Sequence, residues 1–275
     1  MSELTIPCAY QGGKYRIAKQ IVNIISEYIK DDNTKFYDLC CGSGAVSIEL
    51  VNQGFNPENI HMVDKSPWGL FWKMIGNRTF DIKIFKKYVE DVPKDKFKIQ
   101  KHIKDLYKNP TYDNLVYEFL LLQATSFGSK SVWWENDKWC TSSFRNYWQP
   151  NGIAKRTSPV NPMIPMPEVI YERVKGLCEN LKGIKGYWDN CDDIHIEPNS
   201  IIYIDPPYIN TSGYGFNFNY MNFINLYKNN NIIFLSEGIK LSDNAIQISG
   251  ERKKGGINGN RKTKNDEWLN IFKVV

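Results

Sequence analysis

Apolar residues recur at helical spacing between Tyr15 and Ile29, which predicts a helix over this segment. A short apolar run at 35–40 predicts a buried strand, and Gly42 to Gly44 predict a tight turn after it. A helix is expected over 45–52 and a second strand over 60–64. A strand, a glycine turn, a helix and a strand in this order predict the opening of a Rossmann-like sheet, and so an α/β fold.

The pattern changes between about residues 67 and 185. Residues 81–108 are rich in lysine at helical spacing, and Leu115 to Ala124 are predicted to form a largely apolar helix. Glu135 to Asp137 lie between short aromatic and polar pieces, where they are placed to turn a β-hairpin. The stretch from Pro150 to Pro167 contains five prolines and predicts a loop.

Strand signals resume after this stretch, at residues 186–188, 201–205 and 231–236. We therefore predict an α/β sheet domain built from residues 1–68 and 186–275. Residues 69–185 are predicted to form an inserted, mainly helical module that contains the hairpin.

The composition narrows the class of protein. The 275 residues are 42% hydrophobic, which is enough for a sizeable core, and no apolar run reaches the ~20 residues of a membrane span. The N-terminus lacks the layout of a signal peptide, and the six cysteines include no C-x-x-C pair, so we expect a cytoplasmic protein with reduced thiols and no metal. The net charge of +5 is consistent with a polyanionic partner.

Two features of the first half could hold a nucleoside-like ligand. Gly42 and Gly44 follow a strand, where glycine lets the backbone pass close to a ligand and the next helix offers free N–H groups. The third glycine of a dinucleotide fingerprint is missing, which argues against NAD or FAD. Asp64 ends the next strand, where a carboxylate can accept from both ribose hydroxyls. Each feature by itself also occurs in structural turns.

The tetrapeptide from Asp205 to Tyr208, Asp-Pro-Pro-Tyr, follows an apolar strand. Two prolines fix the backbone and donate no N–H, so nearby carbonyl oxygens are free to accept from another group. With a carboxylate and an aromatic ring beside them, they can grip the amino group of a planar heterocycle and stack on its face. A purely structural turn is the alternative.

Three motifs of the chain belong together: Tyr10-Gln11-Gly12-Gly13-Lys14, Asp38-x-x-x-Gly42-x-Gly44 and Asp205-Pro206-Pro207-Tyr208. In combination they resemble the Dam-type, alpha-class DNA adenine-N6 methyltransferases. The resemblance spans nearly the whole chain, and it implies a Rossmann-like methyltransferase sheet with a DNA-recognition module between the cofactor motifs and the catalytic motif. A terminal hairpin from Arg252 through Arg261 to Leu269 is also implied.

The resemblance implies S-adenosylmethionine as cofactor. Tyr10 and Lys14 would contact it from the N-terminal loop, Gly42 and Gly44 would pass under its methionine portion, and Asp64 would hold the ribose. Asp193 is preferred to Asp192 as the acid at the cofactor adenine. The complete set of implied cofactor residues is Tyr10, Gly12, Lys14, Asp38, Gly42, Gly44, Asp64, Asp193 and Asp205.

The implied reaction is methyl transfer to the exocyclic N6 of adenine in a specific duplex DNA sequence. Asp205 and the Pro206 carbonyl would accept from the amino group, and Tyr208 would stack on the base. Because the target atom cannot be reached inside a duplex, the base must be flipped out. Neither a metal nor a covalent intermediate is required.

The inserted module is expected to read double-stranded DNA. The aromatic hairpin could wedge into the base stack, while Arg145 and Asn146 carry donors suited to base edges. The hairpin tryptophans could equally form the core of the module. The candidate DNA-binding residues are Trp133, Trp134, Lys138, Trp139, Arg145, Asn146, Arg252, Lys253 and Arg261.

One departure concerns the recognition sequence. Family members that read GATC carry an Asn-Gly-x-x-Arg-Tyr-Asn stretch before the hairpin, where this chain has residues 127–134, Phe-Gly-Ser-Lys-Ser-Val-Trp-Trp, so GATC is not assumed. An RNA adenine-N6 methyltransferase and a catalytically silent DNA-binding relative are the alternatives. A monomer or weak dimer is expected, with a role in restriction–modification or phage modification.

Overall fold

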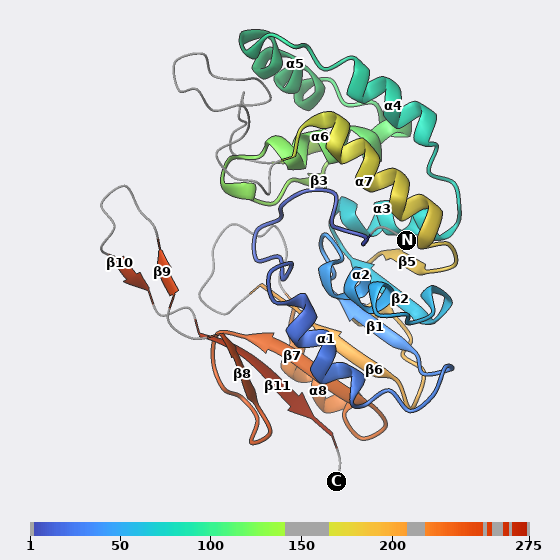
Figure 1. The fold of residues 1–275 in the computed structure, drawn as a ribbon, viewed down its shortest axis with the longest axis vertical. Coiled ribbons are helices and arrows are strands. Elements are labelled where there is room, and N and C mark those ends of the chain that lie inside the picture. The colour runs from blue at the N-terminus through green and yellow to red at the C-terminus, as the bar shows by residue number, and fades with distance from the viewer. Residues whose placement is uncertain are drawn as a thin grey trace.

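The computed structural model describes residues 3–140, 165–207, 218–249, 252–254, 261–263 and 266–273 (Figure 1). Within them a seven-stranded sheet has the order β5-β2-β1-β6-β7-β11-β8. Its strands are β1 (Phe36–Leu39), β2 (Ile60–Asp64), β5 (Lys185–Trp188), β6 (Ile201–Ile204), β7 (Ile232–Glu237), β8 (Ile246–Ser249) and β11 (Glu267–Phe272). The first five in spatial order are mutually parallel, and β11 runs antiparallel to both β7 and β8. This mixed α/β arrangement is consistent with a Rossmann-like methyltransferase fold.

Helices cover both faces of the sheet, which explains why its central strands are continuous apolar runs. Every residue of β1 and β6 is buried. One face packs against α1 (Ala18–Ser26), α2 (Ala45–Asn52) and α3 (Pro67–Gly76). The other face packs against α8 (Tyr220–Tyr227) and the segment that contains Ile194 and Ile196.

A group of helices lies beyond one end of the sheet (Figure 1). It comprises α4 (Ile82–Glu90), α5 (Lys96–Lys108), α6 (Leu115–Thr125) and α7 (Pro167–Asn180), with a hairpin of β3 (Trp133–Glu135) and β4 (Lys138–Cys140). All residues of α6 are buried, as expected for a largely apolar helix. A second two-stranded pair, β9 (Arg252–Lys254) with β10 (Arg261–Thr263), lies apart from the main sheet.

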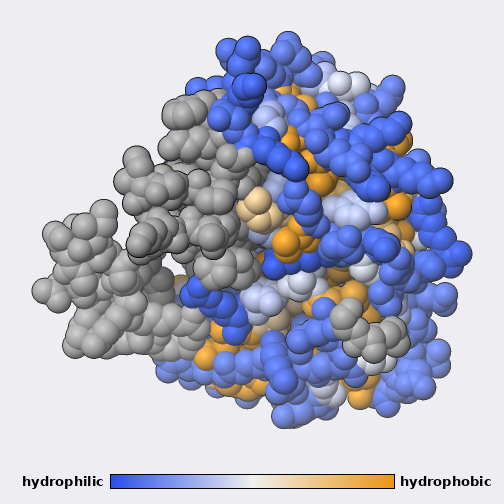
Figure 2. Space-filling view, turned by 45° about the horizontal axis from the view of Figure 1, so that its top comes forward, coloured by the Kyte–Doolittle hydropathy of each residue, from blue (hydrophilic) through white to orange (hydrophobic). Residues whose placement is uncertain are grey.

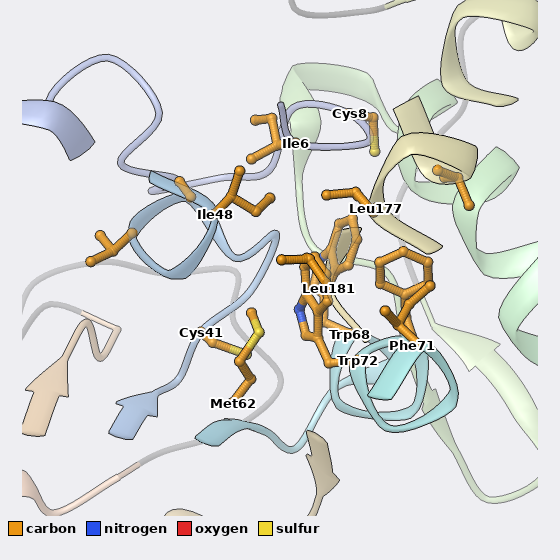
Figure 3. Close-up of a cluster of buried hydrophobic side chains, with 14 of the residues drawn as sticks. Ile6, Cys8, Cys41, Ile48, Met62, Trp68, Phe71, Trp72, Leu177 and Leu181 are labelled. Carbon is orange, nitrogen blue, oxygen red and sulfur yellow. The ribbon is translucent and has the colours of Figure 1, made fainter. Parts of the chain in front are cut away.

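The helical group and the sheet share one apolar core. Trp68, Phe71 and Trp72 of α3 lie between Met62 of β2 and the α7 side of the molecule, marked by Leu177 (Figure 3). The Trp68 ring also meets Phe119 of α6 edge-on, with ring centroids 5.0 Å apart. The predicted module boundary at residue 69 falls inside α3, and a separate module therefore stays a prediction.

Most predicted elements of the sheet domain are confirmed. The predicted helix over 15–29 is shorter, and the hairpin turn at Glu135 to Asp137 is confirmed, with positive φ at Asn136 and Asp137. The resemblance implied a terminal hairpin reaching Leu269. The structure pairs β9 with β10 antiparallel, and residues 267–272 form β11, which pairs antiparallel with β8 and β7 in the main sheet. The predicted proline loop lies outside the described residues up to 164.

Two further observations concern membrane-spanning helices and the molecular surface. In the described part of the chain no helix is long and apolar enough to cross a membrane. The face in Figure 2 is mostly hydrophilic, and its apolar residues form small separate patches. The large apolar side chains are therefore concentrated in the core that α3 joins.

Glycine lets α3 approach the neighbouring backbone closely. A Cβ on Gly76 would lie 2.0 Å from the carbonyl oxygen of Ile184, just before β5, and a Cβ on Gly69 would lie 2.1 Å from the carbonyl oxygen of Asp64. Such distances are far below van der Waals contact. The helix can therefore lie this close to β2 and β5 only with glycine at these positions.

We predict that Gly76→Ala lowers the free energy of unfolding by about 1–3 kcal/mol, because the new methyl group overpacks this contact. Gly176→Ala in α7 is the matched control, since its new methyl would meet nothing closer than Leu4 Cδ2 at 3.7 Å. Alanine favours a helix over glycine by up to about 1 kcal/mol, so the control should be neutral or stabilised. Urea denaturation measures both; equal stabilities would contradict the close approach of α3.

Candidate active site

The candidate site lies at the carboxyl ends of β1 and β6. β1 pairs with β2 on one side and β6 on the other, so the sheet changes its winding direction between β1 and β6. The Asp205 N–H donates to the Leu39 carbonyl at 3.2 Å, which continues the pairing to the strand ends. Open parallel sheets bind ligands outside such a switch point. The two predicted loops, 40–44 and 205–207, both start there.

The loop after β1 is held in a conformation that favours glycine. Gly42 and Gly44 have φ of 49° and 74°, and Cys40 before them has φ of 60°. A Cβ on Gly44 would lie 2.5 Å from Trp72 Cζ2, and one on Gly42 would lie 2.8 Å from the Tyr10 ring. The Trp72 Nε1–H donates to the Gly42 carbonyl at 2.9 Å. The loop is therefore fixed from below by α3 and covered by Tyr10.

The loop leads into α2, whose first turn has no side-chain cap. Its N-terminal N–H groups are therefore suited to an anionic ligand group. Asp38 of β1 accepts a hydrogen bond from Ser47 Oγ of α2 at 2.6 Å and is buried. Burial raises the pKa of Asp38 to about 7, partly offset by the Ser47 hydrogen bond. Asp38 thus ties α2 to the sheet, and its direct contact with a cofactor stays a prediction.

Asp64 lies at the end of β2 and organises two turns. Its Oδ2 accepts from the Gly42 N–H at 2.7 Å, and its Oδ1 accepts from the Ser66 N–H at 2.8 Å. Burial raises its pKa, while these hydrogen bonds lower it. Each carboxylate oxygen has a second lone pair, so Asp64 can hold the glycine loop and still accept from a ligand hydroxyl.

Asp205 and Lys14 form a buried ion pair. Lys14 Nζ lies 2.6 Å from Asp205 Oδ1 and also donates to the Gly12 carbonyl at 2.9 Å. Burial lowers the pKa of Lys14, but the carboxylates of Asp205 and Glu267 outweigh it and hold that pKa above its usual value. The predicted contact of Lys14 with a cofactor stays a prediction.

The charge around Asp205 is mainly negative. Glu267 at the start of β11 has Oε1 3.7 Å from Lys14 Nζ, and Glu237 ends β7. Burial raises the pKa of Asp205 to about 6; Lys14 lowers it, and Glu267 and Glu237 raise it further. Pro206 is buried directly after Asp205. The sequence did not predict a role at the site for either glutamate. Glu237 directly follows a predicted strand, and Glu267 lies in none of the three motifs.

The acid predicted at the cofactor adenine lies in a 3-10 turn at Cys191–Asp193. Cys191 Sγ lies 3.7 Å from Cys40 Sγ, which brings this turn beside the loop after β1. Asp193 Oδ2 accepts from Asn190 Nδ2 at 2.9 Å, and Asp192 and Asp193 are both exposed. The preference for Asp193 stays a prediction.

The hairpin tryptophans have different environments. Trp139 is 2% exposed, stacks on Phe119 and donates from Nε1 to Glu118 Oε2 at 3.3 Å. The structure thus places Trp139 in the core, which agrees with the alternative interpretation that the hairpin tryptophans are core residues. Trp133 and Trp134 are partly exposed, and Trp133 Nε1 donates to Glu135 at 3.4 Å. Their DNA contacts stay predictions, as does that of the exposed Lys138.

The hairpin is connected to the glycine loop. Tyr10, whose ring covers Gly42, has its hydroxyl 3.5 Å from Ser131 Oγ, just before β3. The next N–H, that of Val132, donates to the side chain of Gln123 at 3.0 Å in α6. The N-terminal loop therefore lies between the candidate site and the base of the hairpin.

Some predicted site residues lie outside the described residues, namely Tyr208, Arg145 and Asn146. For Arg252, Lys253 and Arg261 the structure gives the backbone pairing of β9 with β10. Among the described residues no group of three or more His, Cys, Asp or Glu side chains could hold a metal ion.

This fold is consistent with a Rossmann-like methyltransferase. The family model of D12 class N6 adenine-specific DNA methyltransferases matches residues 10–127. Over this segment the chain is similar to the D12 class N6 adenine-specific DNA methyltransferases, consistent with the Dam-type resemblance, and the match supports adenine-N6 methylation of DNA. The family implies a methyl donor and DNA as substrate. No curated protein matches the chain.

The matched segment contains Lys14, Asp38 and Asp64 but ends before Asp205. The pairing of β1 with β6 brings the two halves of the site together, as the 2.6 Å contact between Lys14 and Asp205 makes explicit. The N-terminal loop of the family segment is thus in direct contact with the predicted catalytic tetrapeptide.

Proposed function

We propose that this enzyme uses S-adenosylmethionine to methylate adenine N6 in duplex DNA, with Asp205 and the Pro206 carbonyl gripping a flipped-out base. The observation that carries the proposal is a rigid glycine loop and an Asp-Pro-Pro sequence at the same switch point of the sheet. The loop suits a cofactor, and the tetrapeptide suits a planar amino-heterocycle.

The residues around the glycine loop fit S-adenosylmethionine. The uncapped N-terminus of α2 suits the carboxylate of the methionine portion, and Asp64 has lone pairs for ribose hydroxyls. Either Asp193 or Asp192 would accept from the cofactor adenine. When bound, S-adenosylmethionine supplies an electrophilic methyl group on a sulfonium.

Asp205 would activate the target nitrogen. The exocyclic amino group of adenine is a poor nucleophile, because its lone pair is delocalised into the ring. Acceptors at Asp205 and the Pro206 carbonyl would take its two N–H bonds and localise the lone pair. The nitrogen becomes cationic as it gains the methyl group, and the Asp205 carboxylate stabilises that charge. Tyr208 would stack on the base.

Residues 69–185 would bind the duplex and support base flipping. The hairpin supports this role because its base is joined to the site through Ser131 and Tyr10. Exposed lysines of α4 and α5, such as Lys83, Lys87 and Lys101, would contact phosphates. The basic pair of strands, with Arg252, Lys253 and Arg261, would add further phosphate contacts.

Asp64→Asn should weaken S-adenosylmethionine binding by about 1.5–3 kcal/mol, since hydrogen bonds to a charged group have about that strength. This corresponds to a Kd raised roughly 10- to 150-fold. Ser66→Ala is the milder comparison, because it removes the α3 cap on Trp68 N and the Ser66 side-chain hydrogen bond to Asp64 but keeps the Asp64 carboxylate. Calorimetry with both variants measures the effect; an unchanged Kd in folded Asp64→Asn would refute the ribose contact.

Asp205→Asn should reduce single-turnover methyl transfer at saturating cofactor and DNA by about 10²-fold or more, because it removes the charge that stabilises the cationic product. Cofactor affinity should change much less. In the wild type the rate should fall as the pH is lowered through about 6, because Asp205, with its pKa raised to about 6, then becomes protonated. A near-wild-type rate in Asp205→Asn would show that this carboxylate does not carry the chemistry.

Trp139→Ala and Trp133→Ala should differ. Trp139 is buried and bonded to Glu118, so its removal should destabilise the fold by about 3–5 kcal/mol. Trp133→Ala should leave stability within about 1 kcal/mol and impair base flipping, measured by the fluorescence of 2-aminopurine at the target position. If Trp133→Ala destabilises the protein as much as Trp139→Ala, the wedge role of Trp133 is wrong.

A further inference from the structure

Lys14 occupies the acceptor that the target base needs. Its ammonium lies 2.6 Å from Asp205 Oδ1, the distance of a strong charge-assisted hydrogen bond. A cation at this oxygen competes with the amino group of the base. It would also repel the positive charge that develops on N6 during transfer. The contact seen here must therefore weaken before the methyl group moves.

Lys14 cannot simply move into water. The side chain is 6% exposed, and its ammonium is also held by the Gly12 carbonyl at 2.9 Å. A buried ammonium that loses its carboxylate partner is strongly destabilised, so the ion needs a second carboxylate within the site. That acceptor must lie close enough to be reached by a small movement of the flexible lysine stem.

Glu267 meets this requirement. Its Oε1 is 3.7 Å from Lys14 Nζ, and a shift of about 1 Å would bring the pair to the length of a charge-assisted hydrogen bond. Glu237, the other nearby glutamate, already accepts from its neighbour Gly238 N–H and from the Tyr220 hydroxyl. Of the two glutamates, Glu267 is the one that the structure pairs with Lys14.

The backbone around Glu267 supports a positioned role. β11 is antiparallel, so its first residue reaches the same sheet edge as the last residues of β6 and β7. The register between β11 and β8 shifts between Glu267 and Trp268. Such bulges occur next to active sites, where they redirect a side chain. The Glu267 side chain is 14% exposed and reaches Lys14.

We propose that Glu267 is a positioning residue for methyl transfer: it takes over the Lys14 ammonium when the amino group of the target base displaces that ammonium from Asp205. The inference rests on the proposed role of Asp205 as the acceptor for the base. Glu267 itself need not touch the base or the cofactor. Its carboxylate keeps Lys14 charged and buried while Asp205 is released for the reaction.

The first test is Glu267→Gln, which keeps the shape and removes the charge. The single-turnover rate at saturating cofactor and DNA should fall about 10- to 100-fold, because Lys14 stays on Asp205 and the base is misplaced. Affinity for S-adenosylmethionine and the melting temperature should change little. Asp266→Asn is the matched control: it removes a charge from the adjacent residue, whose carboxylate contacts Gln247, and should keep the wild-type rate. A wild-type rate in Glu267→Gln overturns the proposal.

The second test separates action through Lys14 from a general structural effect. In a Lys14→Met background Glu267 has no ammonium to bind. Adding Glu267→Gln should therefore change the residual single-turnover rate less than about 2-fold. An equal loss in both backgrounds overturns the proposal. This comparison decides the question even if Glu267→Gln lowers stability, because both members of the second pair carry the same uncharged side chain in place of the ammonium.

The pH profile gives a third readout. Among the described residues, Lys14, Glu267, Glu237 and Asp38 are charged groups whose fields act on Asp205. Removing the Glu267 charge should lower the pKa of Asp205, so the acid limb of the Glu267→Gln profile should move to lower pH. An unmoved limb contradicts the proposal. A wild-type enzyme that transfers no methyl group to DNA adenine would instead refute the proposed function, which distinguishes the two failures.

Discussion

The parallel pairing of β1 between β2 and β6 is the constraint on which the site depends. Leu39 lies level with Val63 on one side and with Ile204 on the other, so the three strands end together. Asp64 is the last residue of β2, and Asp205 follows β6 directly. Residues far apart in the chain thereby reach one edge of the sheet, and the apolar runs that fix this register also fix the position of the polar groups.

Burial of charge is the second constraint. The Lys14–Asp205 pair neutralises only part of the negative charge that is buried at the site. One ammonium faces the carboxylates of Asp205, Glu267 and Glu237. Burial, with a further contribution from the neighbouring glutamates, raises the pKa of Asp205 to about 6, yet leaves it ionised near neutral pH. Under the proposed function, this excess of negative charge would stabilise the positive charge that develops on the target nitrogen.

Sequence reasoning predicted the central sheet and its motifs because they depend on local pattern. Apolar runs, glycines after a strand and an Asp-Pro-Pro sequence carry their meaning within a few residues. It did not predict α3, although Ser66 before Pro67 is a readable start signal, with Ser66 Oγ accepting from Trp68 N–H. It also missed Glu267, because an antiparallel strand and a register shift bring that residue to the site, and neither leaves a motif.

The environments of the hairpin tryptophans also could not be predicted from local sequence. Whether a hairpin aromatic is core or surface depends on α6, whose Phe119 and Glu118 receive Trp139. That contact fixes the hairpin against the helical group, while Ser131 at its base meets Tyr10. Tyr10 covers Gly42, and Lys14 further along the same loop holds Asp205. One short N-terminal loop therefore contacts the base of the hairpin, the glycine turn and Asp205, so these three parts of the molecule are connected through packed side chains.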